Sequence, residues 1–325
     1  MKKKLLIIIV LVTLLLSGCT NKKMFKDSFI FMDTYIEVKV YDVDKNKGEE
    51  LLNNARKMYE EYHKLTDRYN SYEGIVNLYY LNNELPINKK IDIDSRLAEL
   101  INYGISMYDK TDGYINFAMG NVIDVWKMYR EEGKSVPKTY ELMDKDINIK
   151  HILLDDNTFM KKSNIKLDLG SFTKGYVTER VSEYFEKNGC TKYLINAGGN
   201  VKVGESYKIG KYKVGLEEPF NTSSVYKTLS VENTSIVTSG SYQRYYEVDG
   251  KNYNHIINPK TLFPDNYTKS VTVITKDSGY ADVLSTYLFL LPIEDGLDLV
   301  NSLDGVEAIW YNDEIYYSEG FMQYE

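Results

Sequence analysis

The chain has 325 residues, enough for one large domain or two closely joined ones, and its 47 acidic residues outnumber 40 basic ones. The formal net charge of −7 argues against a nucleic-acid partner, because such proteins normally present a basic face. The three histidines, His63, His151 and His255, are too scattered for a zinc cluster. Any metal should therefore have oxygen ligands, which points to magnesium or calcium.

The first 18 residues predict a signal peptide. Three lysines at positions 2–4 precede an apolar stretch over residues 5–16, and small residues then lead to Cys19. The apolar stretch is shorter than the roughly 17 to 25 residues that a membrane-spanning helix needs. The pattern is typical of bacterial lipoproteins and implies cleavage before Cys19, lipidation of its thiol and amine, and attachment to the extracytoplasmic face of the cell membrane. The alternative is an ordinary secreted protein with an incidental cysteine.

The remaining chain is expected to form a polar tether over residues 19–28 and one domain over residues 29–325. Alternating apolar and polar side chains predict a strand over Phe29–Tyr41. Apolar residues at helical spacing predict helices over Glu49–Arg68 and Asp94–Tyr108. The charged stretch Arg130–Lys150 has little apolar periodicity, and we expect it to be a surface insertion.

From residue 165 onward, strands and helices follow one another quickly. A strand over Ile165–Leu169 leads into a helix over Thr173–Lys187, and Asn188-Gly189 is a typical helix end. Asp249-Gly250 predicts a hairpin turn. Because the elements do not alternate regularly as βαβ units, we predict an α+β fold with largely antiparallel mixed sheets and packed helices. The other predicted elements are helices over Tyr280–Leu291 and Ile293–Val300 and strands over Lys192–Asn196, Tyr212–Leu216, Lys227–Val231, Tyr242–Val248, Asn252–Ile257, Val271–Thr275, Ala308–Tyr311 and Glu314–Tyr317.

Five short segments in this second half have the composition of a nucleotide site. The first joins the carboxylate of Asp168 to a glycine turn and a helix start, where free backbone N–H groups and Lys174 would attract a phosphate. A plain helix start capped by Ser171 or Thr173, with Lys174 solvated, is the alternative for this segment alone. The five segments are Asp168-Leu169-Gly170-Ser171-Phe172-Thr173-Lys174-Gly175, Asn196-Ala197-Gly198-Gly199-Asn200, Thr238-Ser239-Gly240, His255-Ile256-Ile257-Asn258-Pro259 and Ala281-Asp282-Val283-Leu284-Ser285-Thr286.

The last of these segments is the most specific. Asp282 and Thr286 are four residues apart on a predicted helix, so both oxygens face one side and could enter one coordination sphere. A polar stripe on a surface helix is the alternative, but the neighbouring residues are apolar, and an embedded aspartate needs a partner. His255 is the best candidate among the histidines for proton transfer or phosphate contact, although a strand-end histidine is often merely hydrogen-bonded.

Taken in order, these segments resemble the FAD:protein FMN transferases, the ApbE-like lipoproteins formerly described as thiamine biosynthesis lipoproteins. The likeness begins at Met32-Asp33-Thr34, continues through Thr66-Asp67-Arg68-Tyr69 and Thr111-Asp112-Gly113, and includes all five segments. It implies an ApbE-like fold of two intimately joined subdomains with the active-site cleft between them. It also implies Mg²⁺-dependent transfer of the FMN half of FAD to a threonine hydroxyl of an exported or membrane redox protein, with release of AMP.

The resemblance further implies roles for individual residues. Asp282 would serve the metal and proton removal, and His255 flavin-phosphate contact or base catalysis, two possibilities that the sequence does not separate. The implied metal ligands are Asp282, Thr286 and Ser171, the last through its backbone carbonyl. FAD contacts would fall on Met32, Tyr69, Tyr114, Ile115, Asn116, Asp168, Lys174, Gly175 and His255, while Gly198 and Gly199 are weaker candidates for a phosphate cradle from their composition.

Four positions depart from the family pattern. Asp33 and Leu262 stand where glycine is usual, Asn116 where aspartate is common, and Ser171 where glycine or alanine is common. The residues implied for the metal, together with Lys174 and His255, are all present, so we expect activity. Two alternatives remain open: a Mg²⁺-dependent pyrophosphatase that releases FMN and AMP from FAD, and a non-catalytic flavin-binding lipoprotein.

Overall fold

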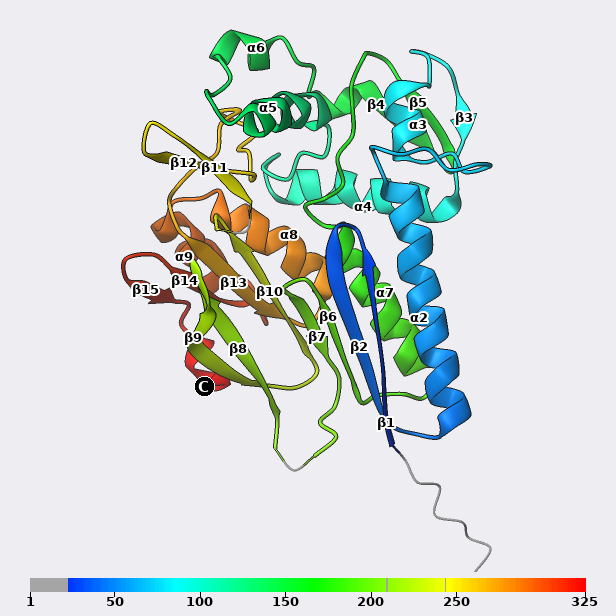
Figure 1. Cartoon of the computed structure of the whole chain (residues 1–325), viewed down its shortest axis with the longest axis vertical. Coiled ribbons are helices and arrows are strands. Elements are labelled where there is room, and N and C mark those ends of the chain that lie inside the picture. The colour runs from blue at the N-terminus through cyan, green and yellow to red at the C-terminus, as the bar shows by residue number, and fades with distance from the viewer. Residues whose placement is uncertain (1–22, 209, 243) are drawn as a thin grey trace, which may run out of the picture.

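The computed structural model describes residues 23–208, 210–242 and 244–325, so the predicted signal peptide, Cys19 and the start of the tether lie outside the described residues. An eight-stranded sheet forms the centre of the molecule, and every neighbouring pair of its strands is antiparallel (Figure 1). The strand order is β1 (Lys23–Phe31), β2 (Thr34–Val43), β6 (Tyr193–Ala197), β7 (Asn200–Val203), β10 (Thr234–Gly240), β13 (Ser270–Thr275), β14 (Glu307–Tyr311) and β15 (Ile315–Tyr317).

Both faces of this sheet are covered. Alternate residues of a strand point to opposite faces: on β10, Val237 packs in the cluster formed with α8, and Ile236 packs in the cluster formed with the β8–β9 hairpin. Helices cover one face, and a two-stranded hairpin with a short C-terminal turn of 3₁₀ helix covers the other (Figure 1). These elements are α2 (Lys45–Thr66), α7 (Thr173–Lys187), α8 (Ser278–Phe289) and α9 (Ile293–Asn301) on one side, and β8 (Tyr212–Glu218), β9 (Asn221–Val231) and η2 (Phe321–Tyr324) on the other.

A second, mainly helical part lies beyond one end of the sheet (Figure 1). The arrangement confirms the predicted α+β fold with antiparallel sheets. None of the helices among the described residues is long and apolar enough to cross a membrane. The second part contains α3 (Leu78–Asn83), α4 (Ser95–Lys110), α5 (Gly120–Glu132), α6 (Thr139–Met143), η1 (Ile149–His151), the small sheet of β3 (Ile91–Asp92), β5 (Thr158–Lys161) and β4 (Ile152–Asp155), and the hairpin of β11 (Tyr245–Val248) and β12 (Lys251–Asn254).

The helices predicted from apolar spacing are present within a few residues of their expected bounds. For α7 the bounds agree at both ends, and Gly189 follows the helix with a φ of +78°, a left-handed conformation that glycine adopts readily. The predicted hairpin turn is also confirmed. Asp249 and Gly250 both have positive φ and join β11 to β12.

The single strand predicted over Phe29–Tyr41 is wrong, because this stretch folds back on itself as the hairpin of β1 and β2. Met32 and Asp33 form its tight turn with φ values of +53° and +55°, the backbone that a two-residue hairpin connection requires. The tether expected up to residue 28 also ends earlier, since β1 begins at Lys23.

The predicted strand Ile165–Leu169 joins no sheet. Its backbone groups are satisfied instead by distant partners: the side chain of Asn82 accepts from the Leu167 N–H at 2.7 Å and donates to the Leu167 carbonyl at 2.9 Å. The Asp168 N–H donates to the Phe117 carbonyl. A buried segment needs such partners whether or not it lies in a sheet, so apolar character alone did not distinguish the two cases.

The stretch Arg130–Lys150 is mostly exposed, as expected of a surface segment, but it is not a separate insertion, because Pro137 and Leu142 are buried in the fold. It starts inside α5 and continues into α6, and both helices contribute to an apolar cluster around Trp126. The Trp126 indole N–H donates to the Leu262 carbonyl at 2.9 Å, and its ring stacks on Tyr253. This cluster fixes the β11–β12 hairpin against α5.

Candidate active site

A cavity of about 500 Å³ lies between the end of the sheet and the helical part above it. The β1–β2 turn, the β6–β7 turn, the end of β10, the first turn of α7 and the middle of α8 all open into it. Residues from all five segments singled out in the sequence therefore line one pocket. A pocket of this size, bordered by both apolar and charged side chains, can enclose much of a dinucleotide.

Most of the predicted site residues border this cavity. Gly175 and Gly199 are not among its lining residues, and Cys19 lies outside the described part of the chain. Those that line it are Met32, Tyr69, Tyr114, Ile115, Asn116, Asp168, Ser171, Lys174, Gly198, His255, Asp282 and Thr286.

Asp282 links α8 to the start of α7. The residue that precedes α7, Phe172, has no side-chain group that caps the helix. Instead, the backbone N–H of Gly175 in the first turn donates to Oδ2 of Asp282 at 2.8 Å. The positive end of the α7 dipole thus faces this carboxylate. A Cβ added at Gly175 would lie 2.5 Å from the Cβ of Asp282 and 2.3 Å from the Ser278 carbonyl. Gly175 is therefore required for the close approach of α7 and α8, and it does not line the cavity.

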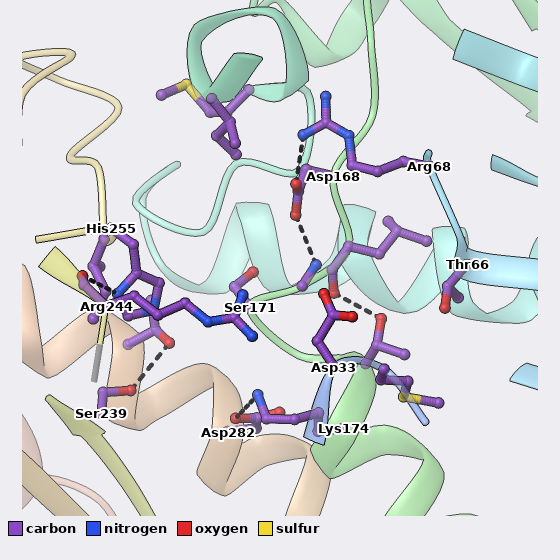
Figure 2. A pocket seen from close by; sticks show the side chains of 18 of the residues that line it. Asp33, Thr66, Arg68, Asp168, Ser171, Lys174, Ser239, Arg244, His255 and Asp282 are labelled. Atoms are coloured by element: carbon purple, nitrogen blue, oxygen red, sulfur yellow. Dashed lines mark hydrogen bonds and ion pairs between the residues drawn. The ribbon is translucent and has the colours of Figure 1, made fainter. Parts of the chain in front are cut away.

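The electrostatics around Asp282 leave its carboxylate poorly compensated. The residue is only 4% exposed, and burial raises the pKa of its carboxyl group above the usual range for aspartate. Lys174 opposes this shift, but its Nζ lies 3.9 Å from Oδ1 of Asp282, longer than a hydrogen bond (Figure 2). One turn further along α8, the Thr286 hydroxyl lies 3.4 Å from the Ser239 hydroxyl of β10. The floor of the pocket thus presents one buried carboxylate beside hydroxyl groups.

These donors fit a hard divalent cation. Within residues 23–208, 210–242 and 244–325, no three His, Cys, Asp or Glu side chains are grouped to hold a metal. A site for Mg²⁺ does not need such a cluster, because this ion commonly takes one or two carboxylates and completes its octahedron with water and substrate phosphate. The buried, weakly paired carboxylate of Asp282 provides the charge that such an ion would balance.

His255 is held on the opposite side of the pocket by the hairpin. Its backbone N–H and its Nδ1 both lie within hydrogen-bond distance of the Arg244 carbonyl, at 3.0 and 3.2 Å. Because a carbonyl only accepts, this contact places the proton on Nδ1 and leaves Nε2 unprotonated. Burial, reinforced by the charge of Arg244, lowers the pKa of His255 to about 4. The ring is therefore neutral at pH 7 and can accept a proton.

Arg68 belongs to the Thr66-Asp67-Arg68-Tyr69 motif, but the sequence argument gave it no role. Its side chain is buried and donates to Asp168 at 2.7 Å, to Asp124 at 2.7 Å and to the Gly120 carbonyl at 2.9 Å. The second oxygen of Asp168 accepts from the Gly170 N–H at 2.9 Å. Both oxygens of Asp168 are thus engaged, and this network fixes the loop that leads into α7 (Figure 2).

We expect Arg68→Met to lower the free energy of unfolding by about 3–5 kcal/mol, because it leaves two partly buried carboxylates without their shared cation. Urea unfolding monitored by circular dichroism measures the change. Lys45→Met is the control, since Lys45 and Glu49 form a well-exposed pair 3.7 Å apart that should contribute almost nothing. Equal stability of the Arg68→Met and Lys45→Met proteins would contradict the prediction.

The remaining predicted contacts form the upper walls of the pocket. Tyr69 is 47% exposed, and Nζ of Lys127 lies 3.8 Å from its ring centre. Asn116 already uses its amide within the fold, donating to the Ile147 carbonyl at 3.0 Å and accepting from the Ala118 N–H at 2.9 Å. Asparagine supplies both the donor and the acceptor that these two hydrogen bonds use, whereas an ionised aspartate would supply only the acceptor.

Two departures from the family pattern retain a glycine-like backbone. Asp33 and Leu262, at positions where the family usually has glycine, have φ values of +55° and +64°. Aspartate enters this left-handed region more readily than leucine does. The Leu262 N–H donates to the Asn258 carbonyl at 2.7 Å, and the Leu262 carbonyl accepts from Trp126, so its turn is stabilised on both sides.

Comparison with known sequences supports the resemblance. The sequence profile of the ApbE family matches residues 32–310. A FAD:protein FMN transferase of Klebsiella pneumoniae is 34% identical over 206 residues, which cover 61% of this chain and 63% of the relative. The FAD:protein FMN transferase of Haemophilus influenzae is 28% identical over 230 residues, 67% of this chain and 66% of that protein. The chain thus spans just under two thirds of the length of these curated relatives.

Solved structures show the same fold. The ApbE protein of Thermotoga maritima superposes with a TM-score of 0.82 at 24% identity, covering 93% of this chain and 99% of the other. The flavin transferase ApbE of Vibrio cholerae gives a TM-score of 0.78 at 22% identity, with 94% and 100% coverage. The architecture is therefore shared at low sequence identity.

Proposed function

Because the chain belongs to the ApbE family, we propose that it transfers the FMN moiety of FAD to a threonine hydroxyl of an acceptor protein and releases AMP. The observation that carries this proposal is the meeting of Asp282, Lys174 and His255 around one pocket large enough for much of a dinucleotide. Relatives named FAD:protein FMN transferase support the choice of FAD and of a protein acceptor.

In the proposed reaction, the acceptor hydroxyl oxygen attacks the phosphorus of the FMN half. A new O–P bond forms, the bond from this phosphorus to the bridging oxygen breaks, and AMP leaves with the electron pair. The hydroxyl proton goes to Nε2 of His255, which is unprotonated and held in place by the Arg244 carbonyl. Lys174 contributes a positive charge beside the diphosphate, and the walls around Met32 and Ile115 exclude water.

Asp282 and Thr286, with the backbone carbonyl of Ser171, are the residues that would hold Mg²⁺. When bound, this ion neutralises diphosphate charge and stabilises the charge that develops on the bridging oxygen. The burial of Asp282 favours this assignment, because a buried carboxylate whose nearest cationic group is 3.9 Å away gains much from a bound cation.

The function is tested by incubating the protein with FAD, Mg²⁺ and an acceptor that carries an Asp-x-x-Thr-Gly-Ala-Thr-like segment. Mass spectrometry should then show the acceptor heavier by one FMN moiety, with AMP formed in equal amount. AMP and free FMN without labelled acceptor would instead indicate a pyrophosphatase, and intact FAD retained by the protein would indicate a flavin-binding protein.

We also propose that Cys19 carries a lipid anchor that holds the domain at the extracytoplasmic face of the membrane. The support is the sequence alone: a basic start, an apolar stretch and small residues before the cysteine. In cells given labelled palmitate, the wild-type protein should incorporate label and fractionate with membranes. A Cys19→Ala protein that still incorporates the label would refute the anchor site.

A further inference from the structure

Arg244 projects from the hairpin into the pocket, although nothing in the sequence argument singled it out. It immediately precedes β11, and its carbonyl accepts from the N–H of His255, one step beyond the Tyr245–Asn254 pair of the ladder. Residues opposite each other in an antiparallel pair direct their side chains to the same face. Figure 2 accordingly shows the Arg244 guanidinium and His255 on the same side of the pocket, with the guanidinium pointing toward the space bordered by Ser171 and Asp282.

The charge of Arg244 has no protein counterpart in the described part of the chain. No carboxylate there lies within ion-pair distance of its guanidinium, whereas Arg68 contacts two carboxylates at 2.7 Å and Lys174 approaches Asp282 at 3.9 Å. Arg244 is exposed and lines the cavity, so its guanidinium is accessible to a ligand there. After burial, the positive charge of Arg244 is the next cause of the lowered pKa of His255. A pocket that contains a cation without a carboxylate partner is suited to an anionic ligand.

We propose that Arg244 binds the diphosphate of the dinucleotide and stabilises the negative charge that leaves with AMP. This inference rests on the proposed function and adds a catalytic residue to it. A planar guanidinium donates two parallel hydrogen bonds to phosphate oxygens, which an ammonium does not match. As the phosphorus–oxygen bond breaks, the bridging oxygen takes the electron pair, and a guanidinium in contact with the departing phosphate gains interaction energy in the transition state.

The chain offers a matched control for the loss of charge. Lys251 lies on the neighbouring strand β12 with Nζ 5.3 Å from the ring centre of Tyr253, and it does not border the cavity. Lys251→Gln removes one positive charge from the same hairpin without touching the pocket. Arg244→Lys keeps the charge but removes the two-pronged geometry.

The kinetic test measures kcat and KM for FMN transfer with the full chain and each variant. Arg244→Gln should lower kcat/KM on the order of 10²- to 10³-fold, with most of the loss in kcat, and Arg244→Lys should recover only part of it. Added methylguanidinium should partly restore the activity of an Arg244→Ala protein, which a merely structural role would not allow. Lys251→Gln should stay within twofold of wild type. An Arg244→Gln protein within threefold of wild type would overturn the proposal.

A binding measurement keeps this inference separable from the proposed function. Calorimetric titration with ADP in the presence of Mg²⁺ should show at least a tenfold weaker Kd for Arg244→Gln than for wild type and for Lys251→Gln. If the wild-type protein binds ADP but never labels an acceptor, the proposed function fails while the role of Arg244 in diphosphate binding stands. Equal ADP affinity of wild type and Arg244→Gln would refute that role.

Discussion

Replacing Asp282 by alanine should reduce acceptor labelling below about a hundredth of the wild-type rate. The variant loses the carboxylate proposed for the metal, and removal of a single well-placed electrostatic group from an active site typically lowers kcat by 10²- to 10³-fold. It also loses the cap of α7, because Oδ2 of Asp282 accepts from the Gly175 N–H. A helix cap contributes about 1 kcal/mol to stability, so the rate must be compared with the thermal unfolding temperature.

Asp282→Asn separates the two contributions. Its amide oxygen can still accept from Gly175, so α7 keeps its cap, while the charge needed for a cation is gone. We expect Mg²⁺ to raise the Tm of the wild-type protein and to leave the Tm of Asp282→Asn unchanged, since only a ligand bound by the folded state stabilises it. Asp277→Asn, at the start of the same helix and outside the pocket, serves as the control. Labelling by Asp282→Ala at the wild-type rate would refute the assigned role.

Replacing His255 by asparagine should lower kcat by about 10²- to 10⁴-fold, the usual contribution of a positioned general base. The asparagine amide can still donate to the Arg244 carbonyl in place of Nδ1, so the hairpin keeps this hydrogen bond. What is lost is Nε2, the nitrogen proposed to take the acceptor proton. Single-turnover labelling measures the chemical step directly, and a His255→Asn rate within a few-fold of wild type would exclude His255 as the base.

The pH dependence of kcat/KM gives an independent check on His255. Burial lowers its pKa from 6.5 to about 4, so the base is unprotonated throughout the neutral range. The wild-type profile should therefore stay flat from pH 8 down to about 5 and fall only toward pH 4. A profile that already falls near pH 6.5 would show that the histidine titrates as an unperturbed one and that its burial does not control catalysis.

The same lowered pKa makes folding stability depend on pH. Between the pKa of the unfolded chain, 6.5, and that of the folded state, about 4, the unfolded state binds more protons at this site. The contribution of His255 to stability is therefore fully present above pH 6.5 and is lost progressively as the pH falls from 6.5 toward 4. Urea unfolding across this range should show that the free energy of unfolding of the wild-type protein falls relative to that of His255→Asn as the pH decreases.

Elements governed by local signals were predictable from the sequence. The apolar face of α7 and its Asn188-Gly189 end, and the Asp249-Gly250 turn, depend on residues close together in the chain, and the structure has them as expected. The strands β7 and β10 were not predicted, since both follow or end in glycine-containing turns that resembled loops. The order of the five segments sufficed to predict that they meet, because it follows a family pattern.

Contacts between distant residues could not be predicted in this way. The stretch around Leu167, which joins no sheet, depends on Asn82, 85 residues away, and Asp168 depends on Arg68, 100 residues away. No periodic signal in the sequence links either pair. Arg244 and His255 are eleven residues apart, and only the hairpin register places them opposite each other. A pattern of residue types indicates which groups are chemically able to act, but the fold decides which of them face the pocket with a hydrogen-bonding or charged group still available.

The contact of Asp282 with Gly175 makes the floor of the pocket inseparable from the packing of α7 on α8. A side chain at Gly175 would clash with Ser278 and Asp282, so it would force α7 and α8 apart and strain the hydrogen bond between Gly175 and Asp282. We therefore expect substitutions that change which ligand or acceptor the protein binds to be tolerated at the rim of the cavity, on the β11–β12 hairpin and around Tyr69, where side chains are exposed. Substitutions at the base of the cavity disturb the packing of α7 on α8, whereas substitutions at its rim leave that packing in place.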